Sequence, residues 1–156
     1  MQAVKNMKLF KIKTVFAAFS VKFLVKILGI EMPVVASATG LAIKDGKMLF
    51  VKLSYIKGYG LPGGLAKKNE TLEETLEREV FEETGLKIVK MKYFKSYFSN
   101  FYGIPTLAAL YEISVSGKLK SSKEGTPAWI KPNDVMGELA YFNTKEAVLD
   151  YLKIKK

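Results

Sequence analysis

Residues 64–86 read GLAKKNETLEETLEREVFEETGL, and this stretch decides the fold. Its second part predicts a helix over residues 71–84, because Thr71 and Glu74 have the spacing of a capping box and Gly85 is a typical C-terminal cap. An apolar stripe at helical spacing is formed by Leu72, Leu76 and Val80. We therefore expect a helix with one buried face.

The same helix carries an acidic cluster. Glu79 and Glu83 lie one turn apart on the same side, with Glu82 beside them. Carboxylates this close repel one another and raise one another's pKa values unless a cation neutralises them, and oxygen ligands at this spacing suit Mg²⁺ or Mn²⁺. Arg78, one turn before Glu82, can pair with it. The alternative is an ordinary solvated acidic face.

The surroundings of the cluster favour the metal interpretation. The fixed positions are Gly64, Glu70, Arg78, Glu79, Glu82, Glu83 and Gly85, with aliphatic residues at Val80 and Leu86. At every one of these positions the stretch resembles the Nudix box of the Nudix hydrolase family. The order of elements over residues 34–152 is similar to the family's α/β/α sandwich. We therefore expect an α/β fold of this type with a mixed sheet, and assign residues 33–156 to the hydrolase domain.

The resemblance implies a reaction in which water attacks phosphorus. The substrate would be a nucleoside diphosphate linked to another group, or a nucleoside triphosphate. The family's roles carry over to Glu79, Glu82 and Glu83 as metal-binding carboxylates and to Arg78 as the residue that orients them. Glu82, Glu83 and Arg78 thereby become catalytic candidates. The implied cofactor is Mg²⁺, with Mn²⁺ as a substitute.

Three further positions, two in the stretch and one just before it, are candidate site residues. Gly63 and Gly64 allow backbone close to metal and phosphates, where larger side chains would obstruct. We assign Gly63 to metal binding and Gly64 to substrate binding. Glu70, grouped with the substrate-binding positions, would support the loop and the start of the helix.

Outside the stretch the candidates are less specific. Glu124 lies in a segment similar to the loop that supplies an extra carboxylate in the oxidised-nucleotide-cleaning branch of the family, although a solvated glutamate is nearly as good an interpretation. Because the chain has no histidine, a carboxylate or a metal-bound hydroxide must act as base. Tyr59 and Tyr102 could stack on a base, and Asn143 could hydrogen-bond its edge, but packing explains the aromatic residues equally well.

The remaining elements follow from local patterns. Residues 34–43 and 48–53 alternate as strands around Asp45 and Gly46, which predicts a hairpin with a type I′ turn. The glycine-rich residues 58–64 predict a loop. The other expected elements are strands over 86–98, 106–115 and 128–130 and a helix over 144–153.

Composition limits the possible functions. A chain of 156 residues supports one domain, and its net charge of +10 favours an anionic partner. It contains no cysteine and no histidine, which excludes thiolate zinc sites and imidazole catalysis. We expect a small nucleotide substrate and no nucleic-acid partner, because no recognised nucleic-acid motif appears. The alternative is a regulatory module of the same fold that binds a nucleotide or an RNA end.

Residues 1–32 differ from the rest of the chain. An apolar run is interrupted by Lys11, Lys22 and Lys26, which fall on one stripe at helical spacing. The charges make the run too short for a membrane span, and a secretory signal would be cleaved inside the next strand. We expect an amphipathic helix that either contacts an anionic membrane or mediates packing and self-association. The protein is then expected in the cytoplasm, with peripheral membrane contact as one possibility.

Overall fold

The structure is a computed structural model. It describes residues 20, 23, 27–29, 31–101, 104–140 and 142–154, apart from the side chains of residues 101, 142 and 143. The amphipathic helix expected over residues 1–32 lies almost wholly outside this part of the chain and stays a prediction.

The predicted hairpin is confirmed. Strand β1 (Val35–Lys44) turns through Asp45 and Gly46 into β2 (Lys47–Leu53), and the two strands pair antiparallel next to the turn. Asp45 and Gly46 both have positive φ, 51° and 71°, as a type I′ turn requires.

Strand β1 lies at the centre of a seven-stranded mixed sheet. It pairs in parallel with β6 (Ile104–Ser116) and antiparallel with the short β4 (Gly63–Leu65). On the far side of β6, β5 (Lys87–Phe101) forms the outer edge. Beyond β1, β2 pairs with both β3 (Tyr59–Gly60) and β7 (Gly125–Ile130).

Helix α2 (Leu72–Thr84) forms as the sequence predicts. Thr71 accepts the N–H of Glu74 and Glu74 accepts the N–H of Thr71, which completes the capping box. Gly85 adopts the left-handed conformation at the other end, with φ of 73°. Leu76 and Val80 are fully buried against the sheet, in a core with Ala38, Ala109, Tyr111 and Ile113.

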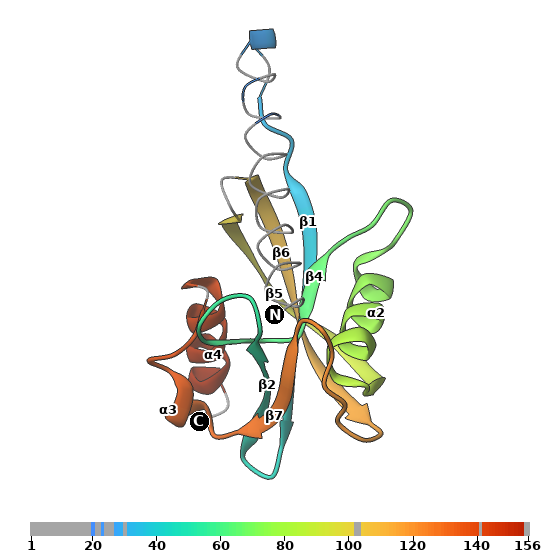
Figure 1. Cartoon of the computed structure of the whole chain (residues 1–156), viewed down its shortest axis with the longest axis vertical. Helices are drawn as coiled ribbons and strands as arrows, with labels where there is room; N and C mark the ends of the chain where they lie inside the picture. The colour runs from blue at the N-terminus through green and yellow to red at the C-terminus, as the bar shows by residue number, and fades with distance from the viewer. Residues whose placement is uncertain are drawn as a thin grey trace, which may run out of the picture.

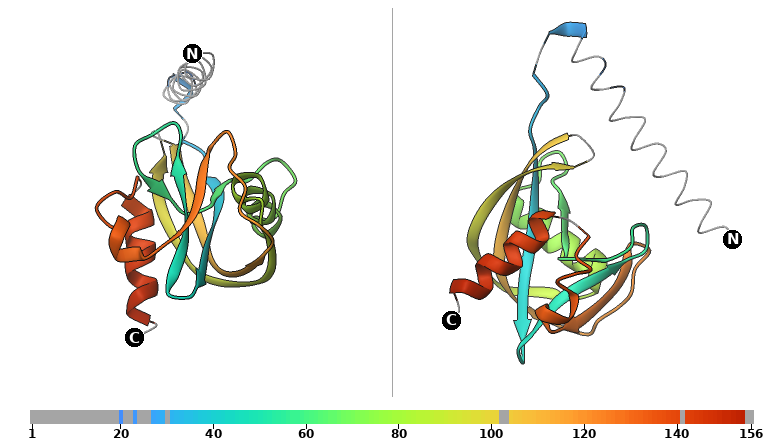
Figure 2. Two further views of the ribbon diagram at one scale, coloured as in Figure 1. Left: turned by 60° about the horizontal axis from the view of Figure 1, so that its bottom comes forward. Right: turned by 90° about the vertical axis from the view of Figure 1, so that its left-hand side faces the viewer.

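The other face of the sheet is covered by α4 (Phe142–Ile154) and the short α3 (Pro132–Val135). Val148 and Tyr151 of α4 pack with Leu41, Phe50 and Leu110 in a second core. Figures 1 and 2 show α2 on one side of the strands and α3 and α4 on the other. The expected α/β/α arrangement with a mixed sheet is therefore confirmed.

Two local expectations were incomplete. Residues 58–64, expected as a loop, also contribute β3 and the start of β4, and α3 was not anticipated. These three elements are too short to show a periodic pattern in the sequence. Among the described residues, no helix has the length and apolar character to cross a membrane.

Candidate functional site

Glu83 is the most buried acidic residue of the site. It sits in the last turn of α2, and only 4% of its surface is exposed. Its carboxylate accepts the backbone N–H of Gly63 at 3.0 Å, which ties the helix to the start of β4. Gly63 has φ of 152°, and a Cβ there would lie 2.3 Å from the carbonyl oxygen of Ala38. A glycine is therefore required for β4 to pair closely with β1 at this point.

Glu79 lies one turn earlier on α2, beside Gly64. A Cβ on Gly64 would come within 2.6 Å of the Glu79 carboxyl group, so the missing side chain makes room for the carboxylate. The Arg78 guanidinium donates to Glu79 at 2.5 Å and holds it from the other side.

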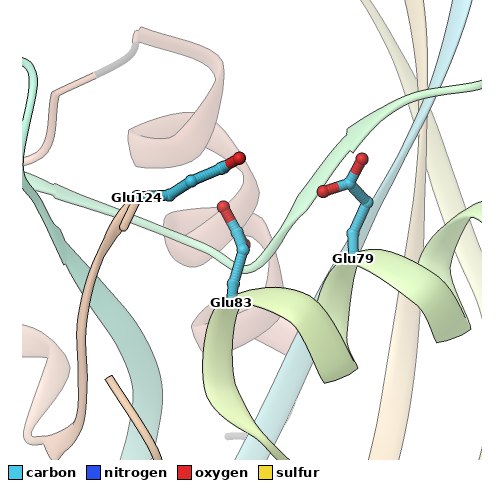
Figure 3. Close-up of side chains that lie close together, drawn as sticks. All are labelled: Glu79, Glu83 and Glu124. Atoms are coloured by element: carbon cyan, nitrogen blue, oxygen red, sulfur yellow. The ribbon is translucent and has the colours of Figure 1, made fainter. Parts of the chain in front are cut away.

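Glu124 reaches the same point from the loop before β7. Carboxylate oxygens of Glu79, Glu83 and Glu124 all lie within 4.8 Å of one another. In Figure 3 the carboxyl groups of Glu83 and Glu124 point toward one another, with Glu79 further along the helix. The loop is fixed to the end of β2, because Ser54 donates its hydroxyl to the Lys123 carbonyl and its N–H to the Glu124 carbonyl. Two segments distant in sequence thus meet around one set of oxygen atoms.

The electrostatics of this group favour a cation. Burial, more than any other cause, raises the pKa of Glu83 to about 8, and the neighbouring charges of Glu124 and Glu79 raise it further against the Gly63 hydrogen bond. The pKa of Glu124 is also raised, first by burial of its carboxyl group and then by Glu79. A divalent cation would remove both the repulsion and the cost of burial. An all-oxygen donor set from carboxylates fits a hard ion such as Mg²⁺ or Mn²⁺.

Arg78 is held by Glu70. Its Nε and Nη2 donate to the two carboxylate oxygens of Glu70 at 2.7 and 2.8 Å, and Glu70 also accepts the N–H of Lys67 and the hydroxyl of Thr75. The Arg78 hydrogen bond is the main reason why the pKa of Glu70 falls to about 2. These hydrogen bonds of Glu70 all lie within the loop and α2.

Glu82 is placed apart from the other carboxylates. Its side chain is 51% exposed, and its carboxylate oxygens lie 3.6 Å from Nη1 of Arg78 and 4.0 Å from Nζ of Lys67. The sequence placed Glu79, Glu82 and Glu83 on one face, whereas the group that the structure brings together contains Glu124 instead of Glu82. Helix periodicity cannot reveal which glutamate a distant loop will approach.

The candidates for substrate binding are more scattered. Gly64 adjoins Glu79, but Tyr59 packs against the core under α4 and its backbone bonds with residues 138 and 140. Tyr102 and the side chain of Asn143 lie outside the described residues. Sequence reasoning missed Ser54, which anchors the Glu124 loop. Its contact spans 69 residues and has no local signal.

Comparison with known proteins agrees with this geometry. The family model of the NUDIX domain matches residues 34–151. An 8-oxo-dGTP diphosphatase from Buchnera aphidicola is 32% identical over 108 residues, covering 67% of this chain and 79% of the relative. An ADP-ribose pyrophosphatase from Methanocaldococcus jannaschii is 32% identical over 123 residues, covering 74% of this chain and 72% of the relative.

A solved structure shows the same fold. The MutT protein of Methanosarcina mazei superposes with a TM-score of 0.67 at 25% identity, covering 80% of this chain and 98% of that one. The chain therefore belongs to the Nudix family and is a Nudix hydrolase that acts on nucleotide derivatives, as the box implied. Enzymes of this family use divalent metal ions, and the carboxylate group described above is where this chain could hold one.

Proposed function

We propose that this enzyme hydrolyses a diphosphate linkage in a nucleoside diphosphate derivative or a nucleoside triphosphate with Mg²⁺, for which Mn²⁺ substitutes. The observation that carries the proposal is the meeting of Glu79, Glu83 and Glu124 within 4.8 Å. Glu79 and Glu83 would hold the metal, with Glu82 and the Gly63 backbone as further candidates from the family pattern, and Glu124 would lie beside it. A bound Mg²⁺ would neutralise charge on phosphate oxygens and lower the pKa of a nearby water.

The residues of the chain have separate tasks in this reaction. The water oxygen forms a bond to phosphorus, the bond from phosphorus to the bridging oxygen breaks, and the leaving phosphate keeps the electron pair. Glu124 accepts the proton of the attacking water, because its carboxylate reaches the group from a separate loop and the chain has no histidine to act as base. Arg78 fixes Glu79 and is itself fixed by Glu70. Two products, each carrying phosphate, result.

The relatives narrow the substrate only to a class. One relative is named for an oxidised nucleoside triphosphate and the other for ADP-ribose. Both of these molecules contain a nucleoside joined to a diphosphate. That shared part is what the carboxylate group would recognise through its metal.

The test is product analysis with the purified chain and Mg²⁺. The panel contains nucleoside triphosphates, oxidised nucleotides, ADP-ribose, nucleotide sugars and dinucleoside polyphosphates. Glu83→Gln should lower kcat at least a hundredfold, because a catalytic metal contributes several kcal/mol and about 1.4 kcal/mol is tenfold. Glu124→Gln should lower kcat with little change in metal affinity.

The matched control is Glu77→Gln, an exposed glutamate on the same helix outside the fixed positions, which should keep full activity. Turnover that survives chelation of divalent ions would contradict the proposal. A folded protein that binds nucleotides without hydrolysing any of them would instead support the regulatory module.

A further inference from the structure

Large apolar side chains are exposed together at the end of the sheet where β1 begins. Val34, which directly precedes β1, is 57% exposed, and Leu107 of β6 is 47% exposed. Phe98 of β5 is 68% exposed and pairs with Leu107, which in turn pairs with Ala36 of β1. Residues paired across neighbouring strands lie side by side. We call Val34, Phe98 and Leu107 the apolar end of the sheet.

Helix α2 does not extend over the apolar end. Ala38 and Ala109 lie two residues further along β1 and β6, on the same face as Ala36 and Leu107, and both are buried in the core beneath α2. Figure 1 shows the start of β1 and the adjoining ends of β5 and β6 beyond the helix. A contiguous group of exposed apolar side chains marks an interaction surface.

The apolar character continues into the segment that leads to β1. Phe23, Ile27 and Leu28 belong to the described residues, and all three are more exposed than Val34. Val34 follows Leu28 after a short connection, so the chain passes from exposed apolar residues of this segment to the apolar end. One apolar partner could therefore contact both.

Basic side chains accompany both parts. The loop between β4 and α2 contains the exposed Lys67 and Lys68, and Ala66 of this loop donates its N–H to the Ala36 carbonyl at 3.0 Å. The loop thus adjoins β1 at the residue that pairs with Leu107. Residues 1–30 contain six lysines and no acidic residue. The partner that fits this combination is apolar in one layer and negatively charged in the next.

We propose that the apolar end of the hydrolase domain contacts an anionic lipid surface. Phe98 and Leu107 enter the interface, where they leave water, and Lys67 and Lys68 face the negative headgroups. This contact adds to the one expected of residues 1–32, and two contacts in one chain bind more tightly than either alone. A second copy facing this end across a two-fold axis would bring the same lysines together, which repel. The inference does not depend on the proposed reaction.

The experiment measures co-sedimentation of the purified chain with vesicles of phosphatidylcholine that contain about one quarter phosphatidylserine. Phe98→Gln combined with Leu107→Gln should lower the partition coefficient about tenfold or more, because two apolar side chains lose their transfer out of water. The matched control is Phe81→Gln combined with Val89→Gln, which replaces an aromatic and an aliphatic residue of comparable exposure elsewhere on the domain. This control should bind as the natural chain does.

The charge of the loop is tested in the same way. Lys67→Gln combined with Lys68→Gln should weaken binding to the anionic vesicles about tenfold, since each lysine near a negative surface strengthens binding several-fold. Binding to vesicles of phosphatidylcholine alone should hardly change. The control is Lys44→Gln combined with Lys47→Gln, at the opposite end of β1, which should leave binding to both kinds of vesicle unchanged.

Insertion is measured directly with Phe98→Trp. Brominated phosphatidylcholine in the vesicles should quench its fluorescence beyond the background of the natural Trp129, whereas Val89→Trp should show that background only. A chain that binds vesicles without quenching of Phe98→Trp would overturn the proposal and leave residues 1–32 as the membrane contact. A natural chain that does not bind the vesicles would overturn it as well. So would a dimer in analytical ultracentrifugation that Phe98→Gln with Leu107→Gln abolishes, because the apolar end would then face a second copy.

Discussion

The backbone of β4 at Gly64 lies against the carboxylate of Glu79. The position of this carboxylate therefore depends on the absence of a side chain at residue 64. A methyl group at that position would need the space that the carboxyl carbon and one oxygen of Glu79 occupy, 2.6 Å away. The Arg78 hydrogen bond prevents Glu79 from simply swinging aside. The geometry of the reacting group therefore depends on a residue with no functional side chain.

Gly64→Ala is expected to lower kcat on the order of a hundredfold, because a displacement of about 1 Å in a catalytic group can cost that much. Steady-state kinetics with a substrate found in the panel above would measure it. Gly137→Ala is the matched control, since a Cβ there meets nothing within 4 Å and its φ is not positive. A fully active Gly64→Ala protein would show that Glu79 does not need this position.

At this scale the sequence predicted the site in part. Residues of the box were found because their spacing follows one helix. Glu124 was found only through a family resemblance, and the meeting with Glu79 and Glu83 depends on where the loop before β7 is anchored. Ser54, its anchor, belongs to a different segment and could not be inferred from spacing.

Among the elements, α2 carries the site and its first turn is stabilised by the capping box of Thr71 and Glu74. Thr71→Ala removes the side-chain acceptor for the Glu74 N–H, and we expect it to lower the free energy of unfolding by about 0.5–2 kcal/mol. Urea denaturation would measure the change. Thr71→Ser keeps the acceptor and should retain most of the stability, so equal losses in both variants would argue against the cap.

Helix α4 is attached to the edge strand β5 through Asp150. Its carboxylate accepts Lys95 Nζ at 2.6 Å and the Tyr97 hydroxyl at 3.1 Å. The Lys95 hydrogen bond is the main cause that lowers the pKa of Asp150 in the folded protein. A carboxyl group with a lowered folded-state pKa stabilises the fold above its ordinary value of 3.8, and this contribution is lost as pH falls through the folded-state value.

Asp150→Asn should therefore be less stable than the natural protein at pH 7, and the difference should shrink as pH falls below 3.8. Thermal unfolding at a series of pH values gives the comparison. A difference that stays constant across the series would mean that the charge of Asp150 contributes nothing.

The elements themselves were predictable where the pattern was long. The hairpin β1–β2 and helix α2 were predicted nearly to the residue, because alternation, turn residues and caps agree there. Strand β7 begins three residues earlier than expected, at Gly125, because Gly125 and Pro127 do not suggest a strand until β2 is available to pair with them.

For the whole molecule, the charge of +10 has more than one origin. Strand β5 is an open edge of the sheet, and Lys87, Lys90, Lys92 and Lys95 are all exposed along it. Lysines on an edge strand oppose pairing with another sheet. Part of the basic charge is thus explained by the fold alone, without an anionic partner.

The lysines of residues 1–32 allow a test of peripheral membrane contact. Changing Lys11, Lys22 and Lys26 together to Gln should reduce co-sedimentation of the full chain with anionic vesicles on the order of a hundredfold, because each lysine near such a surface contributes about 1 kcal/mol. The control is the same change at Lys44, Lys47 and Lys57, which are exposed on the domain. Equal binding of both variants would favour self-association, which analytical ultracentrifugation would then measure.

The parallel pairing of β1 with β6 joins segments that are far apart in the sequence, and this has a consequence for folding. Val35 pairs with Thr106, roughly seventy residues later, so the centre of the sheet closes only after a long loop has been ordered. Helix α2 and the β1–β2 hairpin can form from local contacts while the chain is still being synthesised. We expect Glu83 and Glu124 to come together only once β7 has joined β2, which would make catalytic competence one of the last properties that the folding chain gains.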